Sequence, residues 1–302
     1  MDRPYRALRP GSLIGVVAPA GPAEPEALAQ VEPLLARHGH RARLYPGCHA
    51  RQGYLAGADD VRLADLHAAF ADAEVAAVFC LRGGYGSARL LDRIDRDLVV
   101  RAHKPLIGYS DITALHAWLG RAGLVGLHAP MPASDLVKPG READAHALFA
   151  LLVGGLRAGT SWAPALDAMS PHRDGVAEGR LAGGNLSIVA SLLGTPFACP
   201  SDDAILFLED VGEEPYRVDR LLNQLRLAGV LAAAKGFVLG SFTEQACPQG
   251  VLAEALLPLG KPLLAGWPAG HGTPNRPLPL GARVRLDATR RSLTLLDDVI
   301  AA

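Results

Sequence analysis

Residues 75–86 read Val-Ala-Ala-Val-Phe-Cys-Leu-Arg-Gly-Gly-Tyr-Gly, an unbroken apolar run followed by a glycine-rich segment. A continuous apolar run of this length is typical of a strand that is buried on both faces, and the glycines mark a tight turn after it. The same order returns in residues 12–22, which end in Pro-Ala-Gly-Pro, and again in residues 104–110. Apolar strands that end in short turns before helices indicate a parallel sheet.

Helical patterns fill the gaps between these strands. Apolar residues recur at helical spacing over 24–38, 61–71 and 111–122, and a short helix is expected over 87–93. Residues 41–45 add a further strand. We therefore predict an α/β fold whose N-terminal part is a doubly wound, mostly parallel sheet with helices on both faces. In such a sheet, ligands bind outside the carboxyl ends of the strands.

The pattern changes near residue 155. Residues 155–178 are rich in Gly, Ser, Pro and Asp with little periodicity, which predicts a linker. Beyond it, apolar runs at 204–208 and 236–240 predict strands, and later segments alternate short strands with Pro and Gly turns. We expect an N-terminal α/β domain (1–154), this linker, and a smaller, β-rich α/β C-terminal domain (179–302).

Composition narrows the class of protein. The chain has 302 residues and a formal net charge of −1, so no basic field attracts it to nucleic acid or to an anionic membrane. Its four cysteines are widely spaced, and no His, Asp or Glu cluster has metal-ligand spacing. The polar N-terminus and the absence of an apolar run of transmembrane length predict a cytoplasmic protein without a membrane partner.

Ser110 lies in Ile107-Gly-Tyr-Ser-Asp111, between an apolar run and a helical pattern. A serine at a strand-to-helix turn exposes its hydroxyl, and the first helical N–H groups point at whatever it attacks. Helix capping is the competing interpretation, because serine is common at helix starts. The segment also lacks the second glycine of the hydrolase nucleophile elbow.

A serine nucleophile needs a base and a group that orients the base. Among the ten histidines, His271 stands apart because glycine precedes and follows it, which leaves its imidazole accessible. Glu209 ends the apolar run 205–208, where burial of its charge requires a partner such as an imidazole. His271 as an ordinary turn histidine, and Glu209 as a salt-bridge partner of Arg217 or Arg220, stay open at this point.

Two segments with glycine pairs, Gly83-Gly84 and Gly183-Gly184, complete the set of candidate loops. The glycines of residues 82–86 can form a cradle of backbone amides for an oxyanion or a phosphate, or only a tight turn. Neither a dinucleotide-binding glycine pattern nor a Walker A motif is present, so nucleotide binding has little support. Asn185, which follows the second pair, is expected to turn the chain into a helix that ends at Leu193.

Taken together, these segments resemble the LD-carboxypeptidases, also called muramoyltetrapeptide carboxypeptidases, over nearly the full chain. The matching blocks, in family order, are residues 14–22, 53–72, 82–95, 107–116, 183–196, 206–225 and 270–282. The resemblance implies a serine–histidine–glutamate triad of Ser110, His271 and Glu209, with the serine in the N-terminal domain and the other two in the C-terminal domain. For the acid it favours Glu209 over Glu213.

Further site residues also follow from the resemblance. It implies that the backbone N–H groups of Asp111 and Gly84 hold the oxyanion. Arg82 and Tyr85 are the candidate substrate-binding residues. Arg82 either serves the terminal carboxylate of a peptide, for which arginine is well suited, or supports the glycine turn through carbonyl groups.

The implied reaction is hydrolysis of the L,D-peptide bond of a murein tetrapeptide, which releases terminal D-alanine through an acyl-enzyme during cytoplasmic cell-wall recycling. The resemblance implies a homodimer, and it implies no metal or cofactor. Because the triad would span both domains, their relative position is expected to gate activity. One alternative is a microcin-immunity-type hydrolase of aminoacyl-nucleotide conjugates, although the expected linker carries only Trp162 for base stacking. A non-catalytic peptide- or nucleotide-binding protein is the other.

Overall fold

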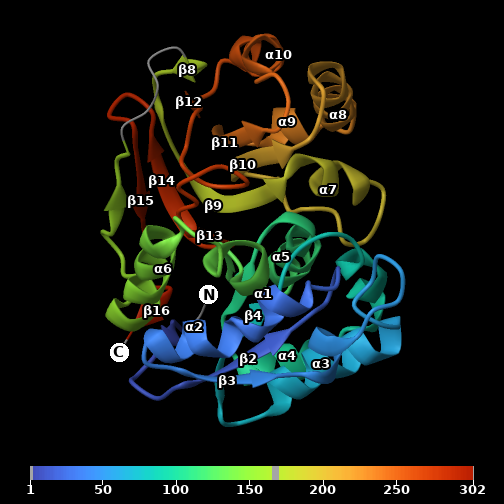
Figure 1. Cartoon of the computed structure of the whole chain (residues 1–302). Coiled ribbons are helices and arrows are strands. Elements are labelled where there is room, and N and C mark those ends of the chain that lie inside the picture. Colours follow the sequence, from blue (N-terminus) through green and yellow to red (C-terminus); the bar gives the residue numbers. More distant parts are fainter. Residues whose placement is uncertain (1–2, 165–169, 302) are drawn as a thin grey trace.

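The structure is a computed structural model that describes residues 3–164 and 170–301, so the expected linker falls partly on residues outside the described ranges (Figure 1). The chain folds around a six-stranded and an eight-stranded sheet. Figure 1 shows the blue-to-green first half around the lower sheet and the yellow-to-red second half around the upper one. This arrangement confirms the predicted α/β fold class.

The six-stranded sheet has the strand order of a doubly wound fold. Its strands, from edge to edge, are β3 (Arg41–Leu44), β2 (Leu13–Val17), β4 (Val75–Cys80), β5 (Leu106–Gly108), β6 (Gly126–His128) and β13 (Leu278–Leu280). The first five are mutually parallel, and β13 is antiparallel to β6. The strand order reverses between β2 and β4, which is where such sheets bind ligands.

Helices cover both faces of this sheet. Alternate residues of β2 contribute to two separate core clusters, with Leu13 and Val17 in one and Ile14 and Val16 in the other. The first cluster includes side chains from α3 (Asp59–Ala71), α4 (Arg96–Ala102) and α5 (Thr113–Arg121). The second includes side chains from α2 (Val31–Arg37) and α6 (Glu142–Gly154). Burial on both faces explains why the central strands are apolar throughout.

Two expected helices differ in detail. The helix expected over 24–38 is two helices, α1 (Pro25–Ala29) and α2, separated at Gln30. The ring of Pro33 would clash with the carbonyl of Ala29 in a continuous helix, which accounts for the break. The short helix over 87–93 is a 3-10 helix, η2 (Ser87–Arg93).

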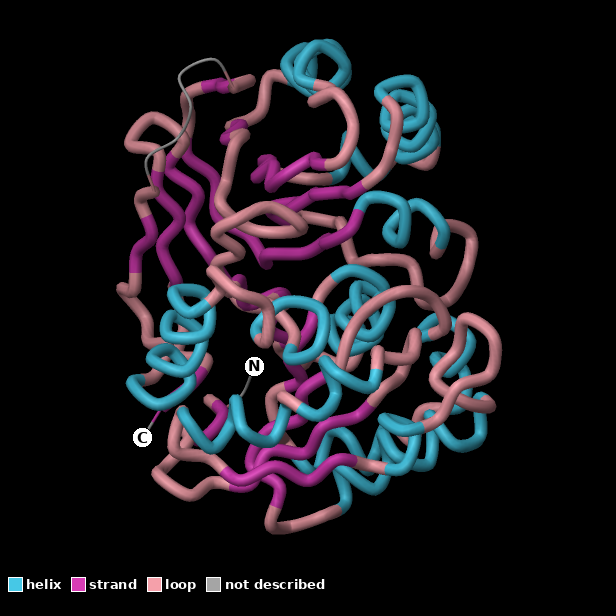
Figure 2. The backbone as a smooth tube through the Cα atoms, in the orientation of Figure 1, coloured by secondary structure: helices cyan, strands magenta, loops and turns pink. Residues whose placement is uncertain are grey.

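The eight-stranded sheet is mixed. Its strands, in order, are β7 (Ser161–Trp162), β15 (Ser292–Leu295), β14 (Arg283–Asp287), β9 (Val176–Asn185), β10 (Ala204–Val211), β11 (Gly236–Thr243), β12 (Leu263–Leu264) and β8 (His172–Arg173). The strands β9 to β12 are parallel neighbours. Its helices are α7 (Leu186–Ser191), α8 (Pro215–Leu227), α9 (Val230–Ala233) and α10 (Gln249–Leu256). Figure 2 shows these cyan helices gathered beside and above the magenta strands of this sheet.

The two halves of the chain share a core. Both hydrophobic clusters draw on residues from each half. The strand β13 comes from the second half and pairs with β6 of the first, while β16 (Ile300–Ala301) pairs with β1 (Tyr5–Arg6). The expected linker supplies β7 and β8 to the second sheet. The domain boundaries at 154 and 179 stay a prediction.

Across residues 3–164 and 170–301, every helix is too short or too polar to cross a bilayer.

Candidate active site

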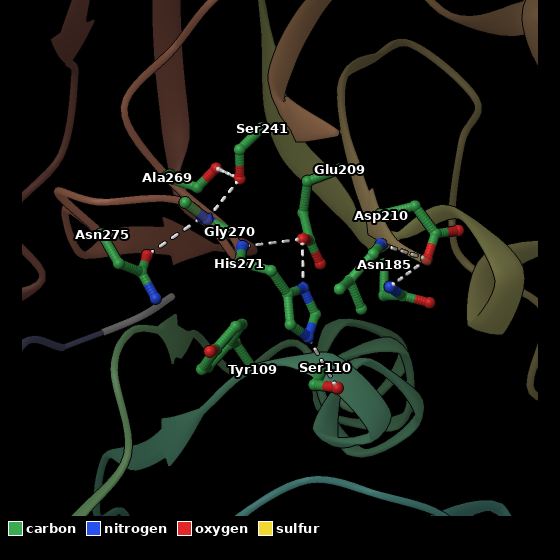
Figure 3. Close-up of polar contacts among 12 residues, drawn as sticks. Tyr109, Ser110, Asn185, Glu209, Asp210, Ser241, Ala269, Gly270, His271 and Asn275 are labelled. Carbon is green, nitrogen blue, oxygen red and sulfur yellow. Dashed lines mark hydrogen bonds and ion pairs between the residues drawn. The ribbon is translucent and has the colours of Figure 1, made fainter. Parts of the chain in front are cut away.

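Three side chains from separate elements meet in one hydrogen-bonded chain (Figure 3). Nε2 of His271 lies 3.2 Å from Oγ of Ser110, and Nδ1 of His271 lies 2.6 Å from Oε2 of Glu209. Ser110 follows β5 of the first sheet, Glu209 belongs to β10 of the second, and the His271 segment lies between β12 and β13. The order of nucleophile, base and acid is the one that a serine hydrolase requires.

The backbone of Ser110 is strained. Ser110 begins the 3-10 helix η3 (Ser110–Ile112) with a φ of +64°, in the left-handed region that costs a non-glycine residue about 1–2 kcal/mol. The N-cap position of η3 is Tyr109, and no side-chain cap is formed there. The Ser110 hydroxyl contacts His271 instead, so the capping interpretation is not what the structure shows. A strained turn that exposes the serine resembles a nucleophile elbow in geometry.

Glu209 is buried completely, at 0 % exposure. Besides the imidazole, its Oε2 accepts the backbone N–H of His271 at 3.2 Å. Gly270 has a φ of +106°, and a Cβ atom there would lie 2.5 Å from Oε2 of Glu209, so only glycine fits before His271. The alternative ion pair is taken by Glu213, whose carboxylate lies 3.9 Å from Arg217. Glu209 is therefore the acid that faces His271.

The surroundings of His271 favour its protonated form. Burial by itself lowers the pKa of His271, but the hydrogen bond and charge of Glu209 oppose burial, together with the charges of Asp135 and Asp210. Their sum raises the pKa of His271 above its ordinary value. The ring of Tyr109 packs on the imidazole at 4.8 Å between centroids, and its hydroxyl donates to Asp135 at 2.9 Å.

The glycine loop after β4 approaches the nucleophile at Gly83. A Cβ atom on Gly83 would lie 2.8 Å from Oγ of Ser110 and 3.5 Å from the backbone nitrogen of Asp111. Gly84 instead packs against Gly21, with 3.3 Å between its Cβ position and the Gly21 Cα. The φ of Gly83 is one that other residues can adopt. Glycine is needed at this position because Ser110 lies so close to it.

Adding a methyl group to Gly83 is expected to block the site without unfolding the protein. Gly83→Ala should lower kcat/KM by roughly 10²-fold, because the methyl group would displace Ser110 or fill the space for the oxyanion. Gly250→Ala is the matched control, since a Cβ atom there meets nothing within 4 Å. Steady-state kinetics and thermal melting of both variants test this. Full activity of Gly83→Ala would contradict the placement of the loop.

Two charged side chains, Arg62 and Asp111, support the loops. Sequence reasoning did not find Arg62, and it assigned Asp111 only as a backbone donor to the oxyanion. Arg62 is fully buried and donates to the carbonyl oxygens of Pro19 and Gly86, which joins the loops after β2 and β4. The signal was present, because Arg62 shares a helical stripe with Leu66. Asp111 is also buried, and its Oδ2 accepts the backbone N–H of Ser87 at 2.8 Å.

Asn185 acts as predicted. Its side-chain oxygen accepts the N–H of Ile188 at 3.2 Å as the N-cap of α7, and its Nδ2 donates to Asp210 at 2.8 Å. The helix ends at Ser191 rather than Leu193. Within the described ranges, no three His, Cys, Asp or Glu side chains gather into a metal-binding group.

Arg82 and Tyr85 both line a pocket of about 500 Å³ at the point where the strand order reverses. Nη1 of Arg82 donates to the carbonyl of Pro22 at 3.1 Å, in the neighbouring loop rather than its own glycine turn. Nε of Arg82 is buried and has no partner among the described residues. Tyr85 is 49 % exposed and meets Tyr54 edge to face at 5.7 Å. The pocket thus offers a guanidinium and two aromatic rings beside Gly84.

Two family models match separate parts of the chain. The LD-carboxypeptidase N-terminal domain family matches residues 14–129, and the LD-carboxypeptidase C-terminal domain family matches residues 178–286. A probable murein peptide carboxypeptidase of Bacillus subtilis (strain 168) is 36% identical over 303 residues, which cover 96% of this chain and 93% of that protein. A murein tetrapeptide carboxypeptidase of Pseudomonas aeruginosa is 36% identical, covering 92% of this chain and 94% of its own length.

Solved structures agree on the fold. A muramoyltetrapeptide carboxypeptidase from Oxalobacter formigenes superposes with a TM-score of 0.85 at 30% identity and covers 95% of this chain and 99% of its own. The wild-type apo microcin C7 self-immunity protein MccF superposes with a TM-score of 0.91 and covers 99% of this chain and 100% of its own. At 21% identity, that second likeness shows the fold alone.

Proposed function

The chain belongs to the LD-carboxypeptidase family and is a carboxypeptidase, and from this premise we propose that it releases terminal D-alanine from murein tetrapeptides. The bond cleaved is the L,D-peptide bond. The observation that carries the proposal is the hydrogen-bonded chain from Ser110 through His271 to Glu209. The relatives named as murein peptide and murein tetrapeptide carboxypeptidases support the substrate class.

In the proposed mechanism, His271 takes the proton of the Ser110 hydroxyl while Glu209 holds the imidazole by its Nδ1–H. Ser110 Oγ attacks the carbonyl carbon of the L-configured centre and forms a tetrahedral intermediate. Protonated His271 gives its proton to the nitrogen of the departing D-alanine, which leaves an acyl-enzyme. Water activated by His271 then hydrolyses the ester and frees Ser110.

The proposed oxyanion donors are backbone N–H groups of Asp111 and of the loop after β4. Gly84 is the predicted donor from that loop, and the close approach of Gly83 to Ser110 supports a role for this loop. Arg62 and Asp111 fix the far end of the loop through Gly86 and Ser87. Donors held in advance in this way stabilise the oxyanion without reorganising during the reaction.

The pH profile is expected to report His271 directly. His271 must be neutral to accept the Ser110 proton, so kcat/KM should fall as the pH drops through the raised pKa of His271. The midpoint of this acidic limb is expected above about 6.5, the ordinary histidine value. Measuring kcat/KM from about pH 5 to about pH 9, a range that brackets the ordinary histidine value, tests this. A midpoint at or below the ordinary value would contradict the Glu209–His271 pairing in the active protein.

Arg82 is proposed to bind the carboxylate of the terminal D-alanine. Its position in the pocket beside Gly84 supports this role. Arg82→Ala should therefore raise KM for a tetrapeptide by roughly 10- to 100-fold, as expected for a lost charge-assisted hydrogen bond. Arg82→Ala should also cleave a tetrapeptide with an amidated terminal carboxylate as well as it cleaves the free acid. Equal losses on both substrates would assign Arg82 to loop support alone.

A second candidate is hydrolysis of aminoacyl-nucleotide conjugates by the same three residues. The exposed Tyr54–Tyr85 pair at the pocket favours it, because exposed aromatic rings can stack on a nucleobase. Mass spectrometry of products from a murein tetrapeptide and from an aminoacyl sulfamoyl adenylate separates the two. We expect D-alanine and a tripeptide from the first and no turnover of the second. Binding without hydrolysis of either would instead support a non-catalytic protein.

The proposed setting is the recycling of cell-wall fragments in the cytoplasm, and the proposed assembly is a homodimer. Both come from the family resemblance. Analytical ultracentrifugation and fractionation of cells that produce the protein test them separately from the chemistry.

A further inference from the structure

We propose that Asp144 and Arg141, at the start of α6, are positioning residues that hold the base of the reaction against the nucleophile. They do so by anchoring residues 270–275, called here the histidine loop, to the first half of the chain. The inference rests on the proposed function, because it concerns how His271 is held. Neither residue touches the reacting atoms.

Asp144 and Arg141 contact the histidine loop after His271, at Asn275 and Gly272. Oδ1 of Asp144 accepts the backbone N–H of Asn275 at 3.2 Å, and Oδ2 of Asp144 accepts Nη1 of Arg141 at 2.8 Å. Nη1 of Arg141 also donates to the carbonyl of Gly272 at 3.2 Å. The side chain of Asn275 closes the loop on itself, because its Oδ1 accepts the N–H of Gly270 at 3.0 Å (Figure 3).

Burial makes these contacts hard to replace with water. Asp144 is 2 % exposed and Asn275 is 1 % exposed. A buried carboxylate that loses its donors keeps its desolvation cost, so the pair is expected to stay formed in the native protein. An ion pair between Arg141 and Asp144 alone would only support the helix start. The second oxygen of Asp144, however, reaches a backbone group far along the chain.

The anchor matters because the site spans the two halves. Ser241 of the second sheet holds the same loop from the other side: its hydroxyl donates to Ala269 O at 3.2 Å and accepts Gly272 N–H at 2.8 Å (Figure 3). Ser241 therefore sets the loop relative to Glu209. Asp144 and Arg141 set it relative to Ser110, whose Oγ lies 3.2 Å from Nε2 of His271, the atom that takes the proton.

Several charged groups face His271 and enter any pH test. Glu209 and Asp210 come from β10, and Asp135 comes from the π-helix η4 (Pro132–Leu136). His128 of β6 also interacts with His271 electrostatically. Arg141 contacts the histidine loop through the carbonyl of Gly272. Because Asp144 is itself a charge, its removal must be separated from the loss of its hydrogen bonds.

The test compares Asp144→Ala with Asp144→Asn. The alanine variant should lose roughly 10- to 100-fold in kcat with KM within about threefold, as expected for a displaced catalytic group. Its acidic limb should stay near that of wild type, because Ser241 still holds the histidine loop against Glu209. The asparagine variant keeps an acceptor for the Asn275 N–H and should restore most of kcat. Glu142→Gln, an exposed acid in the same helical turn, is the matched control and should behave as wild type.

A probe that reacts with serine nucleophiles makes the result independent of the natural substrate. Labelling of Ser110 by a fluorophosphonate should slow in Asp144→Ala by a factor similar to that for kcat. If Asp144→Ala does not fold, Arg141→Gln takes its place, since it frees Gly272 O and Oδ2 of Asp144 but leaves the bond from Asn275 to Asp144. A loss of kcat with unchanged KM is again expected. If the fluorophosphonate labelled the wild-type protein but the protein did not hydrolyse the tetrapeptide, the proposed function would be refuted. The comparison of labelling rates would still test the role of Asp144.

Two outcomes would overturn the proposal. Equal shifts of the acidic limb in Asp144→Ala and Asp144→Asn, with equal kcat, would mean that only the charge of Asp144 acts. Unchanged kcat and labelling rate in folded Asp144→Ala would mean that the residue serves stability alone.

Discussion

Replacing Ser110 with alanine is expected to reduce kcat by roughly 10⁴-fold or more while the protein stays folded. The hydroxyl is the group that forms the acyl-enzyme in the proposed mechanism, and its Oγ contacts Nε2 of His271. Among residues 3–164 and 170–301, no other hydroxyl forms a hydrogen bond with the His271 imidazole. The expected loss is therefore that of the nucleophile itself.

Stability should change little in this variant. Ser110 is half-buried, and its left-handed backbone strain is the same for alanine as for serine. We expect the free energy of unfolding to stay within about 1 kcal/mol of wild type, as is usual for a small substitution outside the core. Urea denaturation and tetrapeptide turnover, measured on one preparation, test both halves of the prediction. A folded Ser110→Ala variant with more than a tenth of wild-type kcat would show that another group attacks.

Replacing Glu209 with glutamine is expected to have the second largest effect. The amide keeps the shape of the carboxylate but cannot stabilise the imidazolium that forms when His271 takes the proton. A loss of roughly 10³- to 10⁴-fold in kcat follows, by analogy with the effect of neutralising the acid of a serine hydrolase triad. The acidic limb should also move to lower pH, because the charge that raises the pKa of His271 has gone.

Glu213→Gln is the matched control for this variant. Glu213 lies in the same segment, and its carboxylate pairs weakly with Arg217 at 3.9 Å. We expect its kcat within about threefold of wild type, since a partly exposed pair at this distance contributes little. The comparison also tests the choice between the two acids that the sequence left open. A larger loss in Glu213→Gln than in Glu209→Gln would reverse the assignment.

Much of the fold was predictable because the information is local. Unbroken apolar runs such as 75–81 predict buried parallel strands, and their polar or glycine-rich ends mark the edge where a site forms. Ser110, Glu209 and His271 each stand at such an end or in such a loop, which made them candidates, and the family resemblance then assigned them as a triad. The break at Gln30 was also readable, since Pro33 carries its steric cause within the sequence.

The parts that could not be predicted depend on contacts between distant segments. Pairing of β13 with β6 and the bond from Asn275 to Asp144 join residues that no local pattern connects. The same holds for Arg62, whose role depends on two loop carbonyls rather than on its helical neighbours. The β13–β6 pairing and the bond from Asn275 to Asp144 tie the second half of the chain to the first. They place the histidine loop next to Ser110 without requiring the halves to close.

Trapping the acyl-enzyme tests the central claim most directly. A tetrapeptide analogue in which D-lactate replaces D-alanine carries an ester at the scissile position, so attack should be fast and the acyl-enzyme should accumulate. Acid quenching during turnover, digestion and mass spectrometry then locate the adduct. We predict one tripeptide acyl group on the peptide that contains Ser110, and none in Ser110→Ala. Hydrolysis of the analogue with the acyl group on another residue, or with no adduct at any time, would contradict the account.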